Sequence, residues 1–474
     1  MKFAPPTVNI AKEIISRARG DHPAIVAGRC EIDFASLLSR AEEAAAWLRC
    51  RIGRPAHPGM VRRVGLACPN GVDYITTALG ILLADACLVP VPDELTPAET
   101  TDLATRTALH GIVRVDGGVP HWQPLGGGGA DFDEAAFAAL DPAFIRFSSG
   151  TTGESKGVVI SHRRLIERIT AANHGMRIGA DDRVLWMLPM AHHFAVSIIL
   201  YLYHGATTVL VDSHLAGDVL ETAEKTQATV IYGSPFHHAL LAADGSGFRW
   251  PSLRLAVSTA ASLPEETATR FHARFGQPLV QGLGVIEVGL PLLNLDDAET
   301  HPTSLGRPLP DYQIEIRDDA GRPADPGDVG ELWVMGPGFF DAYLSPWRLS
   351  QNVCPCGWFA TGDLAEVDAA GRVFLRGRRK SVLNISGMKV FPEEIEAVLD
   401  AHPGVRRSRV SGRDHPVFGT IPVADVVPRD AAAPPNAAEL VAWCRQSLSA
   451  FKVPAKVSLV PGIDMTASGK IRRG

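Results

Sequence analysis

Short apolar runs alternate with segments of helical spacing from about residue 60 onward. An apolar run at residues 64–68 is followed by a turn at residues 69–71, by helical spacing over residues 74–84, and by a second run at residues 87–91. The same alternation predicts further strands at residues 208–211, 229–232, 253–257 and 279–282, with helices at residues 216–225 and 264–275. Because repeated strand–helix units form parallel sheets covered by helices, we expect an α/β fold.

The pattern changes after about residue 310. Strands joined by short turns are predicted at residues 312–317, 330–335 and 373–376, which indicates a β-rich subdomain without intervening helices. The C-terminal part alternates again on a smaller scale, with helices at residues 392–400 and 437–448 and strands at residues 405–410 and 423–427. We therefore expect a large N-terminal domain of helix-covered sheets, a β-rich subdomain near its end, and a small α+β C-terminal domain.

Composition and charge exclude several classes of protein. The 474 residues suggest about three globular units, the formal net charge is −6, and 46% of the residues are hydrophobic. This excludes a disordered chain, and it argues against nucleic-acid binding through a global positive field. The seven cysteines are scattered and odd in number, so no disulfide framework is predicted. The one close pair, Cys354 and Cys356, lacks a second pair or a nearby histidine, which argues against zinc.

No membrane-spanning or targeting segment is predicted. Asp85, Pro90 and Pro92 interrupt the most apolar stretch, residues 74–92, before it reaches the ~20 residues that a membrane span needs. Residues 1–13 contain no continuous apolar segment of the kind found in a signal peptide. We therefore expect a cytoplasmic protein.

The segment with the strongest chemical signal is a loop rich in glycine, hydroxyl groups and lysine. A strand-like stretch over residues 143–147 leads into Ser148-Ser149-Gly150-Thr151-Thr152-Gly153-Glu154-Ser155-Lys156-Gly157. Backbone N–H groups, hydroxyls and an ammonium together can wrap phosphates. The loop is not a Walker A motif, because Ser155 and Gly157 stand where that motif needs glycine and Ser or Thr.

The sequence resembles the AMP-forming adenylating enzymes, which include acyl-CoA synthetases, the adenylation domains of peptide synthetases, and luciferases. Their phosphate loop reads Ser/Thr-Ser-Gly-Thr-Thr-Gly-x-Pro-Lys-Gly, and residues 148–157 differ from it only at Ser155, which replaces the proline. Further motifs follow in the family's order: Leu188-Pro189-Met190-Ala191-His192-His193, Leu283-Gly284-Val285-Ile286-Glu287, Thr361-Gly362-Asp363-Leu364, Gly377-Arg378-Arg379-Lys380 with Ser386-Gly387 after it, and Ser468-Gly469-Lys470-Ile471. Six ordered motifs identify the chain as a member of this family.

The resemblance implies that a carboxylic acid reacts with ATP to give an acyl-adenylate and pyrophosphate, and that a thiol then takes the acyl group. Asp363 would accept hydrogen bonds from both ribose hydroxyls, and Arg378 would add a donor. Glu287 would hold Mg²⁺, and Lys470 would neutralise charge at the α-phosphate during the displacement. The other residues implied to bind ATP or AMP are Ser148, Ser149, Gly150, Thr151, Thr152, Gly153, Lys156, Leu283, Gly284, Ile286 and Gly387.

The resemblance also implies two domains and a thiol acceptor. Residues 1–379 would form the AMP-binding domain, and residues 380–474 a mobile domain that rotates about Lys380 between the half-reactions. Residues 384–392 resemble the segment that lines the pantetheine tunnel of acyl-CoA ligases, so coenzyme A is the first choice of acceptor. The phosphopantetheine of an acyl carrier protein is the alternative. The protein would act as a monomer or a homodimer on a small carboxylic acid.

The pocket motif indicates which residues would contact the acid. They are His192, which would also take part in catalysis, together with His193, Phe194, Ser197 and Gly282. Members that activate amino acids carry an aspartate in the stretch that corresponds to residues 193–197, which has no acidic residue here. An α-amino acid is therefore not expected. Residues 189–192 and 294–297 resemble members that activate aryl acids, and aryl, polycyclic and medium-length apolar acids all stay open.

Two positions depart from the family pattern. Leu283 replaces the aromatic residue that stacks on adenine, and Ile286 replaces the threonine that bonds the nucleotide phosphate. Losing one charge-assisted hydrogen bond costs roughly 1.5–3 kcal/mol, which predicts slower ATP turnover. Besides a CoA ligase, three alternatives therefore stay open. They are an adenylation enzyme that loads a carrier protein, a ligase that mainly converts supplied acyl-AMP to a thioester, and a non-catalytic binder of nucleotide or acyl-adenylate.

Overall fold

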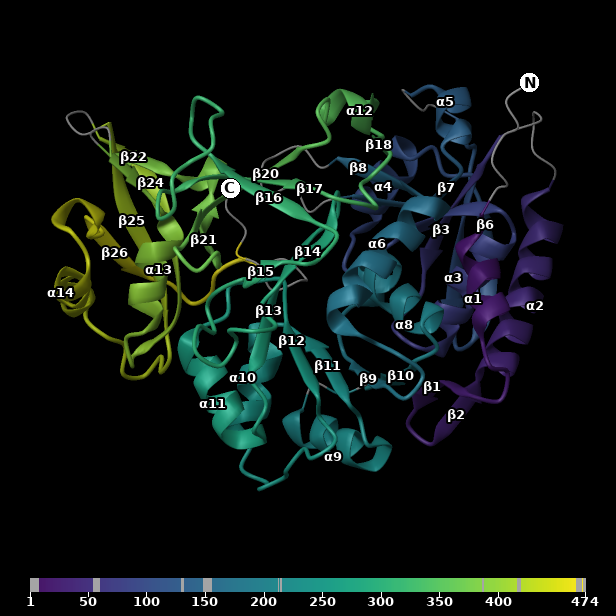
Figure 1. Ribbon diagram of the computed structural model, residues 1–474, viewed down its shortest axis with the longest axis horizontal. Helices are drawn as coiled ribbons and strands as arrows, with labels where there is room; N and C mark the ends of the chain where they lie inside the picture. The colour runs from purple at the N-terminus through teal and green to yellow at the C-terminus, as the bar shows by residue number, and fades with distance from the viewer. Residues whose placement is uncertain are drawn as a thin grey trace.

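The computed structural model describes residues 8–53, 60–128, 132–147, 156–211, 213, 215–385, 388–415, 419–465 and 471. For Lys380, Asn384, Met388, Lys389 and Gly419 it describes the backbone alone. Figure 1 shows two sheets with helices around them and a smaller C-terminal part at one side. The expected α/β fold class is confirmed.

The first sheet has nine strands in the order β15-β14-β13-β12-β11-β9-β10-β1-β2. Strands β13, β12, β11, β9, β10 and β1 are parallel to one another, and the others pair antiparallel at the two edges. The bounds are β1 (Pro23–Ala27), β2 (Cys30–Asp33), β9 (Arg183–Trp186), β10 (Thr207–Leu210), β11 (Val230–Gly233), β12 (Leu255–Ser258), β13 (Leu279–Val285), β14 (Gly289–Leu293) and β15 (Arg307–Pro308). The four strands predicted in this region are present, whereas β1 and β2 lie outside the predicted pattern.

The second sheet has eight strands in the order β19-β18-β8-β7-β4-β3-β5-β6. Its centre, β7, β4, β3 and β5, is parallel, and β8, β18, β19 and β6 pair antiparallel around it. The bounds are β3 (Arg62–Ala67), β4 (Ala86–Pro90), β5 (Gly111–Asp116), β6 (Val119–Pro124), β7 (Pro142–Phe147), β8 (Gly157–Ser161), β18 (Ala342–Tyr343) and β19 (Arg348–Leu349).

The helices form the layers around the two sheets. They are α1 (Ile10–Arg17), α2 (Phe34–Ile52), α3 (Val72–Leu83), α4 (Pro97–Arg106), α5 (Glu134–Ala139), α6 (His162–Met176), α7 (Met190–His193), the π-helix η1 (Phe194–Ile198), α8 (Ile199–Tyr203), α9 (Ala216–Thr226), α10 (Pro235–Ala243) and α11 (Glu265–Phe275). Helices α1, α2, α3, α6 and α8 contribute to a large core that also contains one face of each sheet. Helices α9–α11 cover the other face of the first sheet, and α4 and α5 cover that of the second.

The alternation of side chains along each strand decides which face meets which core. In β9, Val184 and Trp186 join the central core, whereas Leu185 packs against α9–α11. In β7, Phe144 joins the central core and Ile145 packs on the opposite side. Strands buried on both faces read as nearly continuous apolar runs. The sequence pattern located β7 in this way, but it did not predict the four-residue β9.

A third sheet of four antiparallel strands, β16-β17-β20-β21, forms the expected β-rich subdomain. Its strands are β16 (Gln313–Arg317), β17 (Gly330–Met335), β20 (Phe359–Val367) and β21 (Val373–Arg378). The expectation that no helix intervenes needs one correction, because the short α12 (Ser350–Val353) lies between β17 and β20. Here the chain leaves the third sheet to add β18 and β19 to the second sheet before it returns as β20.

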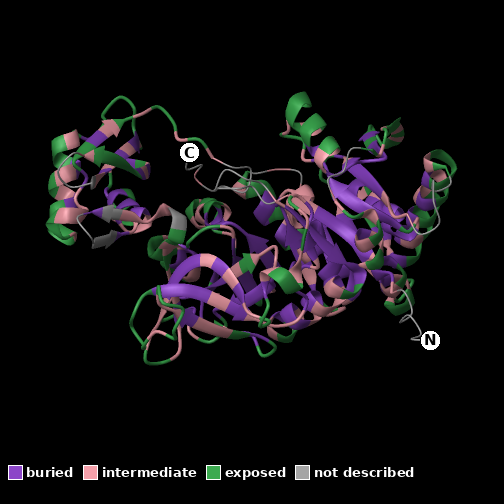
Figure 2. Cartoon of the chain, turned by 90° about the horizontal axis from the view of Figure 1, so that it is seen from above, coloured by how far each residue is buried: buried purple, intermediate pink, exposed green. Residues whose placement is uncertain are grey.

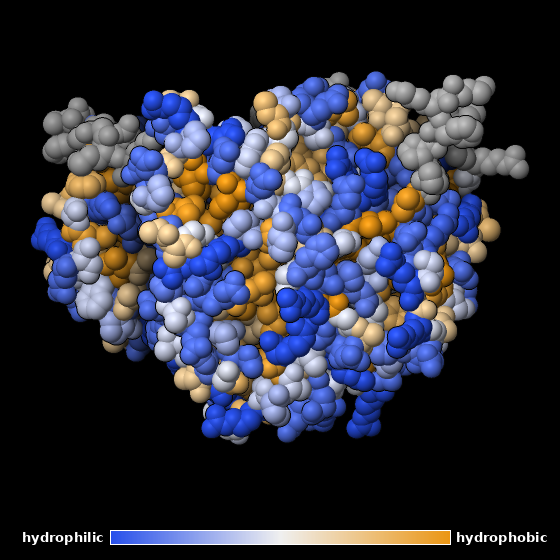
Figure 3. Space-filling view, in the orientation of Figure 1, coloured by the Kyte–Doolittle hydropathy of each residue, from blue (hydrophilic) through white to orange (hydrophobic). Residues whose placement is uncertain are grey.

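The C-terminal part is a small domain with its own core. It contains η2 (Arg379–Ser381), β22 (Leu383–Ile385), β23 (Met388–Val390), α13 (Pro392–Asp400), β24 (Val405–His415), β25 (Gly419–Pro428), α14 (Ala437–Ser447), η3 (Ala450–Lys452) and β26 (Lys456–Leu459). Figure 2 shows this domain beside the larger body, in which the buried residues concentrate in the sheets. Figure 3 shows hydrophobic side chains at the surface along the boundary between the two parts.

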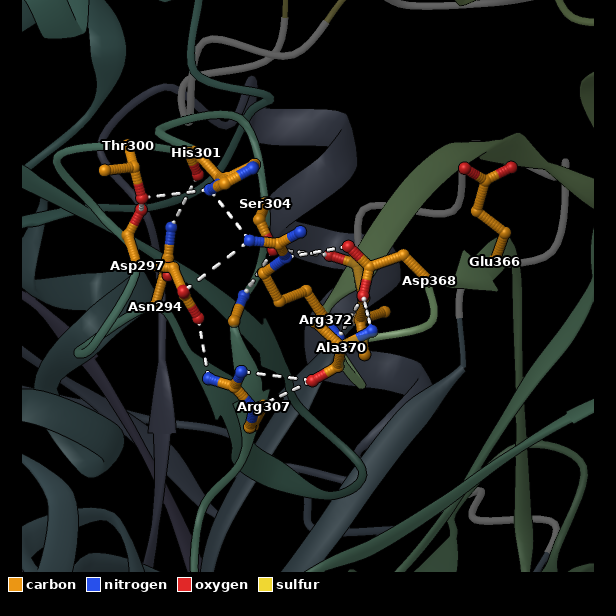
Figure 4. Close-up of polar contacts among 12 residues, drawn as sticks. Asn294, Asp297, Thr300, His301, Ser304, Arg307, Glu366, Asp368, Ala370 and Arg372 are labelled. Carbon is orange, nitrogen blue, oxygen red and sulfur yellow. Dashed lines mark hydrogen bonds and ion pairs between the residues drawn. The ribbon is translucent and has the colours of Figure 1, made fainter. Parts of the chain in front are cut away.

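A polar network fastens the loop after β14 to the turn between β20 and β21 (Figure 4). Arg307 Nη1 lies 2.6 Å from Asp297 Oδ2, and the same guanidinium donates to the Ala370 carbonyl. Arg372 Nη1 lies 2.9 Å from His301 Nδ1. The network therefore ties the turn of the third sheet to the edge of the first sheet.

Several histidines are buried in the neutral state. Burial lowers the pKa of His110, His162 and His238 to about 4. His238 Nε2 donates to the Val257 carbonyl at 3.0 Å, and the Ile10 N–H donates to His162 Nδ1 at 3.2 Å. These rings therefore serve the fold as neutral hydrogen-bonding groups.

We expect the free energy of unfolding to decrease as the pH falls from about 6.5 to 4. Histidine in an unfolded chain titrates near about pH 6.5, so the unfolded state binds protons that the folded state excludes, by up to about 1.4 kcal/mol per pH unit for a fully buried ring. Urea-unfolding midpoints at about pH 7, 6 and 5 measure this dependence. His238→Gln should weaken it and the exposed His121→Gln should not. Midpoints that do not change with pH would contradict the expectation.

Candidate functional site

Asp363 and Arg378 face each other across the antiparallel pair β20–β21. They are register partners, and Arg378 Nε lies 2.7 Å from Asp363 Oδ1. The Asp363 side chain is 5% exposed and the Arg378 side chain is 45% exposed, so the guanidinium remains accessible to a ligand. Gly362 has a φ of 75°, a conformation that favours glycine, and the Thr361 hydroxyl accepts the Asp363 N–H at 3.1 Å. The Thr-Gly-Asp motif therefore combines a backbone requirement with a positioned carboxylate.

Glu287 lies in the turn between β13 and β14, where its backbone and side chain are both held. Its carbonyl accepts the Phe340 N–H at 2.8 Å, and its Oε1 accepts the Tyr343 hydroxyl at 3.1 Å. Burial and the negative charge of Glu287 raise the pKa of Tyr343 well above its ordinary value, which keeps the hydroxyl protonated as the donor. Lys156 Nζ lies 4.7 Å from the centre of the Tyr343 ring. Tyr343 thus contacts both a carboxylate and an ammonium.

The predicted phosphate loop connects β7 to β8. Phe147 and Gly157 are register partners at its base, and a Cβ on Gly157 would lie 3.0 Å from both Leu344 Cβ and the Phe147 ring. This close packing explains the glycine and brings Lys156 to the start of β8. The remaining predicted residues of the loop, Ser148, Ser149, Gly150, Thr151, Thr152 and Gly153, lie outside the described residues.

The segment before Glu287 is extended. Strand β13 runs to Val285, beyond the predicted end at Gly282, and pairs with β14. Leu283 and Ile286 are half-buried, and the Ile286 carbonyl accepts from Arg168 Nη1 at 2.9 Å. Gly284 is exposed. The two residues that depart from the family pattern therefore lie at the end of β13, Leu283 within the strand and Ile286 directly before Glu287.

His192 lies on α7, at the end of the first sheet where the strands have their carboxyl ends. Its Nε2 lies 3.4 Å from Glu94 Oε1. Burial and the positive charge of Arg146 lower the pKa of His192, while Glu94 opposes this shift. The second sheet contributes both of these neighbours, because Glu94 follows β4 and Arg146 lies on β7. His192 is therefore held where the ends of the two sheets meet.

Aromatic rings surround the other predicted pocket residues. His193 lies edge-on to Trp186 and Tyr232, with ring centres 5.6 Å and 6.5 Å apart. Phe194 is buried with its ring centre 5.6 Å from that of Tyr74. Ser197 is also buried and lies on η1, a π-helical turn of the kind that often occurs at functional sites. Gly282 packs beneath Leu293, whose Cδ1 lies 3.0 Å from where a Cβ would be.

Three predicted residues of the C-terminal domain cannot be placed. Only the backbone of Lys380 is described, and Gly387 and Lys470 lie outside the described residues. An isolated bridge between Met465 and Ile471 closes the segment that carries Lys470. The site residues thus remain predictions at these positions.

Sequence reasoning missed several residues that the structure brings to the site. Tyr343 comes from β18, at a distance along the chain that gives no signal of its contact with Glu287. Glu94 likewise lacks a motif. Arg146 does carry a signal, since it is the charged residue in the otherwise apolar strand Pro142–Phe147.

The described residues contain no group of three or more His, Cys, Asp or Glu side chains that would hold a metal ion. None of the helices in the described part of the chain is long and apolar enough to cross a membrane.

Comparisons with known proteins match most of the chain. The sequence pattern of the family described as "AMP-binding enzyme" matches residues 13–344, and that of the "AMP-binding enzyme C-terminal domain" matches residues 394–470. A feruloyl-CoA synthase of Amycolatopsis sp is 29% identical in an alignment of 469 positions that covers 94% of this chain and 94% of that protein. A sulfoacetate–CoA ligase of Cupriavidus necator is 32% identical over 337 residues, which are 70% of this chain and 66% of that protein.

Solved structures share the fold. The ATP-bound structure of MatB from Rhodopseudomonas palustris superposes with a TM-score of 0.85 at 24% sequence identity. The superposition covers 98% of this chain and 97% of the MatB chain. This likeness extends over both parts of the molecule.

Proposed function

The chain belongs to the AMP-binding enzyme family as an AMP-forming acid–thiol ligase of the acyl-CoA synthetase type, and we propose that the site described above is its active site. The observation that carries the proposal is the arrangement around Tyr343, with Glu287 bonded to its hydroxyl and Lys156 over its ring. A carboxylate and an ammonium at the base of a glycine-rich loop are what a metal-bound phosphate chain needs. Asp363 and Arg378 would hold the ribose.

The donor set at Glu287 fits magnesium. Mg²⁺ is usually bound by one or two carboxylates together with phosphate oxygens and water, rather than by a cage of protein ligands. Glu287 supplies one such carboxylate, and the described residues offer no competing cluster of metal-ligating side chains. When bound there, the ion would neutralise charge on the phosphates of ATP.

In the first half-reaction a carboxylate oxygen of the acid attacks the α-phosphorus of ATP. The new O–P bond forms as the bond from the α-phosphorus to the bridging oxygen breaks, and pyrophosphate leaves with the electron pair. Lys156 would hold the phosphates, and Lys470 would approach the developing charge from the C-terminal domain. Asp363 and Arg378 would fix the ribose, so that the α-phosphate stays in line with the acid.

In the second half-reaction the C-terminal domain would rotate about Lys380 and admit a thiol. The thiol loses its proton, its sulfur attacks the acyl carbonyl carbon, and AMP leaves as the mixed anhydride bond breaks. Coenzyme A is the proposed acceptor, since the relatives described above include CoA ligases. The phosphopantetheine of a carrier protein remains the alternative acceptor.

We propose an aryl carboxylic acid as the substrate. The half-buried ring of His193 lies against the buried rings of Trp186 and Tyr232 at the carboxyl ends of β9 and β11, and a flat aromatic acid would pack against the His193 side of this group. The relative named feruloyl-CoA synthase supports this class.

Pyrophosphate release tests the proposal directly. We expect release from ATP with at least one member of a panel of benzoates, cinnamates and medium-chain fatty acids, and a CoA thioester by mass spectrometry when CoA is added. Aryl acids should give the highest kcat/KM. A thioester that forms on a carrier protein but not on CoA would instead favour the alternative acceptor.

Leu283 and Ile286 favour one second candidate, a ligase that mainly uses supplied acyl-AMP. The same assays separate the two activities, because this candidate predicts slow pyrophosphate release together with rapid thioester formation from synthetic acyl-AMP and CoA. Acyl-AMP formation at an ordinary rate, of about 1–10 per second, would rule it out.

A further inference from the structure

Arg146 is a charged residue at the end of an otherwise apolar strand. In β7, alternate side chains face the central core, and Arg146 shares this face with the buried Phe144. The predicted phosphate loop begins two residues later. The guanidinium therefore lies on the core-facing side of the strand that leads into this loop. The phosphate-loop motif of the family does not account for a cation here, because that motif begins at residue 148.

The charges around Arg146 come from both predicted halves of the site. The negative charge of Glu287 acts on its guanidinium, and its own positive charge acts on His192. Burial lowers the pKa of Arg146 to about 10, so it remains a cation at neutral pH. The guanidinium is therefore within electrostatic reach of both the predicted magnesium ligand and the predicted pocket histidine.

One N–H of this guanidinium has no acceptor among the described residues. Arg146 Nε is shielded from solvent and makes no hydrogen bond with any residue in the described part of the chain. Two other buried arginines differ in this respect. Arg168 donates three hydrogen bonds to the carbonyls of Gly338 and Ile286, and Arg63 forms a two-pronged pair with Glu134 at 2.7 and 2.8 Å.

A buried cation with an unused donor lowers stability unless an anion completes it. Among the described residues, Glu287 is the carboxylate that acts most strongly on this guanidinium, and it is already bonded to Tyr343. The reaction brings an anion to this place, because the acid must approach a triphosphate of the same sign. A planar guanidinium matches a carboxylate in both charge and shape.

We propose that Arg146 binds the reacting carboxylate of the acid substrate, between His192 and Glu287. This inference rests on the proposed function, and it names a residue that determines the affinity for the acid. The neighbour His192 favours the carboxylate over pyrophosphate, because His192 belongs to the predicted acid pocket and the phosphate chain has its own predicted loop and Lys156.

The test compares Arg146→Met and Arg146→Lys with the wild type in steady-state adenylation, using the best acid of the panel. In Arg146→Met, KM for the acid should rise by about 10- to 150-fold, the range for one lost hydrogen bond to a charged group, while KM for ATP stays within about twofold. Arg146→Lys should recover part of the lost affinity, because lysine keeps the positive charge but lacks the planar pair of donors with which a guanidinium binds a carboxylate. Thioester formation from synthetic acyl-AMP and CoA should be unchanged, since that substrate has no free carboxylate.

Arg106→Met is the matched control. Arg106 lies 4.5 Å from the ring centre of Phe147, the next residue of the same strand, and removing its charge should leave both KM values unchanged. Thermal unfolding is the second readout. Arg146→Met should melt at the wild-type temperature or above it, because it removes a buried cation with an unused donor, whereas a purely structural arginine predicts a lower melting temperature.

Three results would overturn the inference. A rise in KM for ATP or for pyrophosphate in the reverse reaction, with KM for the acid unchanged, would assign Arg146 to the phosphates. Unchanged kinetics, or a melting temperature that falls together with every rate, would remove any role in binding the acid. Failure of the proposed function looks different, because the wild type would then release no pyrophosphate with any acid. Calorimetric binding of benzoate to the wild type and to Arg146→Met would then decide the inference alone.

Discussion

Asp363→Asn is expected to lower kcat/KM for ATP by about 10²-fold or more. The carboxylate is nearly enclosed and is held by Arg378 Nε at 2.7 Å, so it is positioned before the ligand arrives. Asparagine keeps the shape but has a single acceptor and no charge, and a hydrogen bond to a charged group is worth roughly 1.5–3 kcal/mol. The measurement is the rate of acid-dependent pyrophosphate release as a function of ATP concentration.

Asp368→Asn is the matched control for this variant. Asp368 follows the same strand, and its Oδ2 lies 2.7 Å from Arg372 Nε, so it makes a similar ion pair away from the site. We expect it to leave KM for ATP unchanged. If Asp363→Asn behaves like Asp368→Asn, Asp363 does not hold the ribose.

Lys470→Ala is expected to lower the rate of adenylation by about 10²–10³-fold, the usual effect of removing a group that stabilises developing charge. Lys470 itself lies outside the described residues. The bridge between Met465 and Ile471 closes its segment, and Arg407 donates to Met465 Sδ at 3.0 Å. These contacts join Met465 and Ile471, on either side of the predicted lysine, to each other and Met465 to Arg407, so we expect the lysine to belong to the C-terminal domain.

Since we propose that the domain rotates away for the second half-reaction, Lys470→Ala should form thioester from synthetic acyl-AMP and CoA at nearly the wild-type rate. Rapid-quench measurement of each half-reaction separates the two effects. Lys456→Ala, an exposed lysine of β26 in the same domain, should slow neither step. An equal loss of both half-reactions in Lys470→Ala would contradict the assignment.

The boundaries of the predicted elements illustrate what the pattern of apolar residues can locate. Residues 392–400 were predicted as a helix and form α13 with the same bounds, because its apolar positions have helical spacing and Pro392 occupies the first turn. Strands β11 and β12 were found within a few residues, because both of their faces are buried. Strands β1 and β2 were not predicted, because the alternation was identified only from about residue 60, although β1 is itself a short apolar run.

The sequence could likewise predict some residues of the candidate site and its surroundings but not others. Gly362 and Asp363 could be predicted, because a tight backbone turn and the carboxylate that follows it are neighbours in the sequence. The network of Asp297, Arg307 and Arg372 could not, because its members come from two loops that meet only when the third sheet packs against the first. Residues 294–297 resemble a segment of members that activate aryl acids, and in the structure Asp297 pairs with Arg307 and Arg372 in this network.

The sequence by itself determined the α/β class, the order of the motifs and the family. Each of these rests on contiguous runs of residues, in which local backbone conformation and the alternation of apolar side chains suffice. Only the tertiary structure decided that Tyr343 bonds Glu287 and that Arg146 lies near His192. Those contacts join strand ends from separate sheets, and packing between sheets leaves no periodic signal in either partner's own sequence.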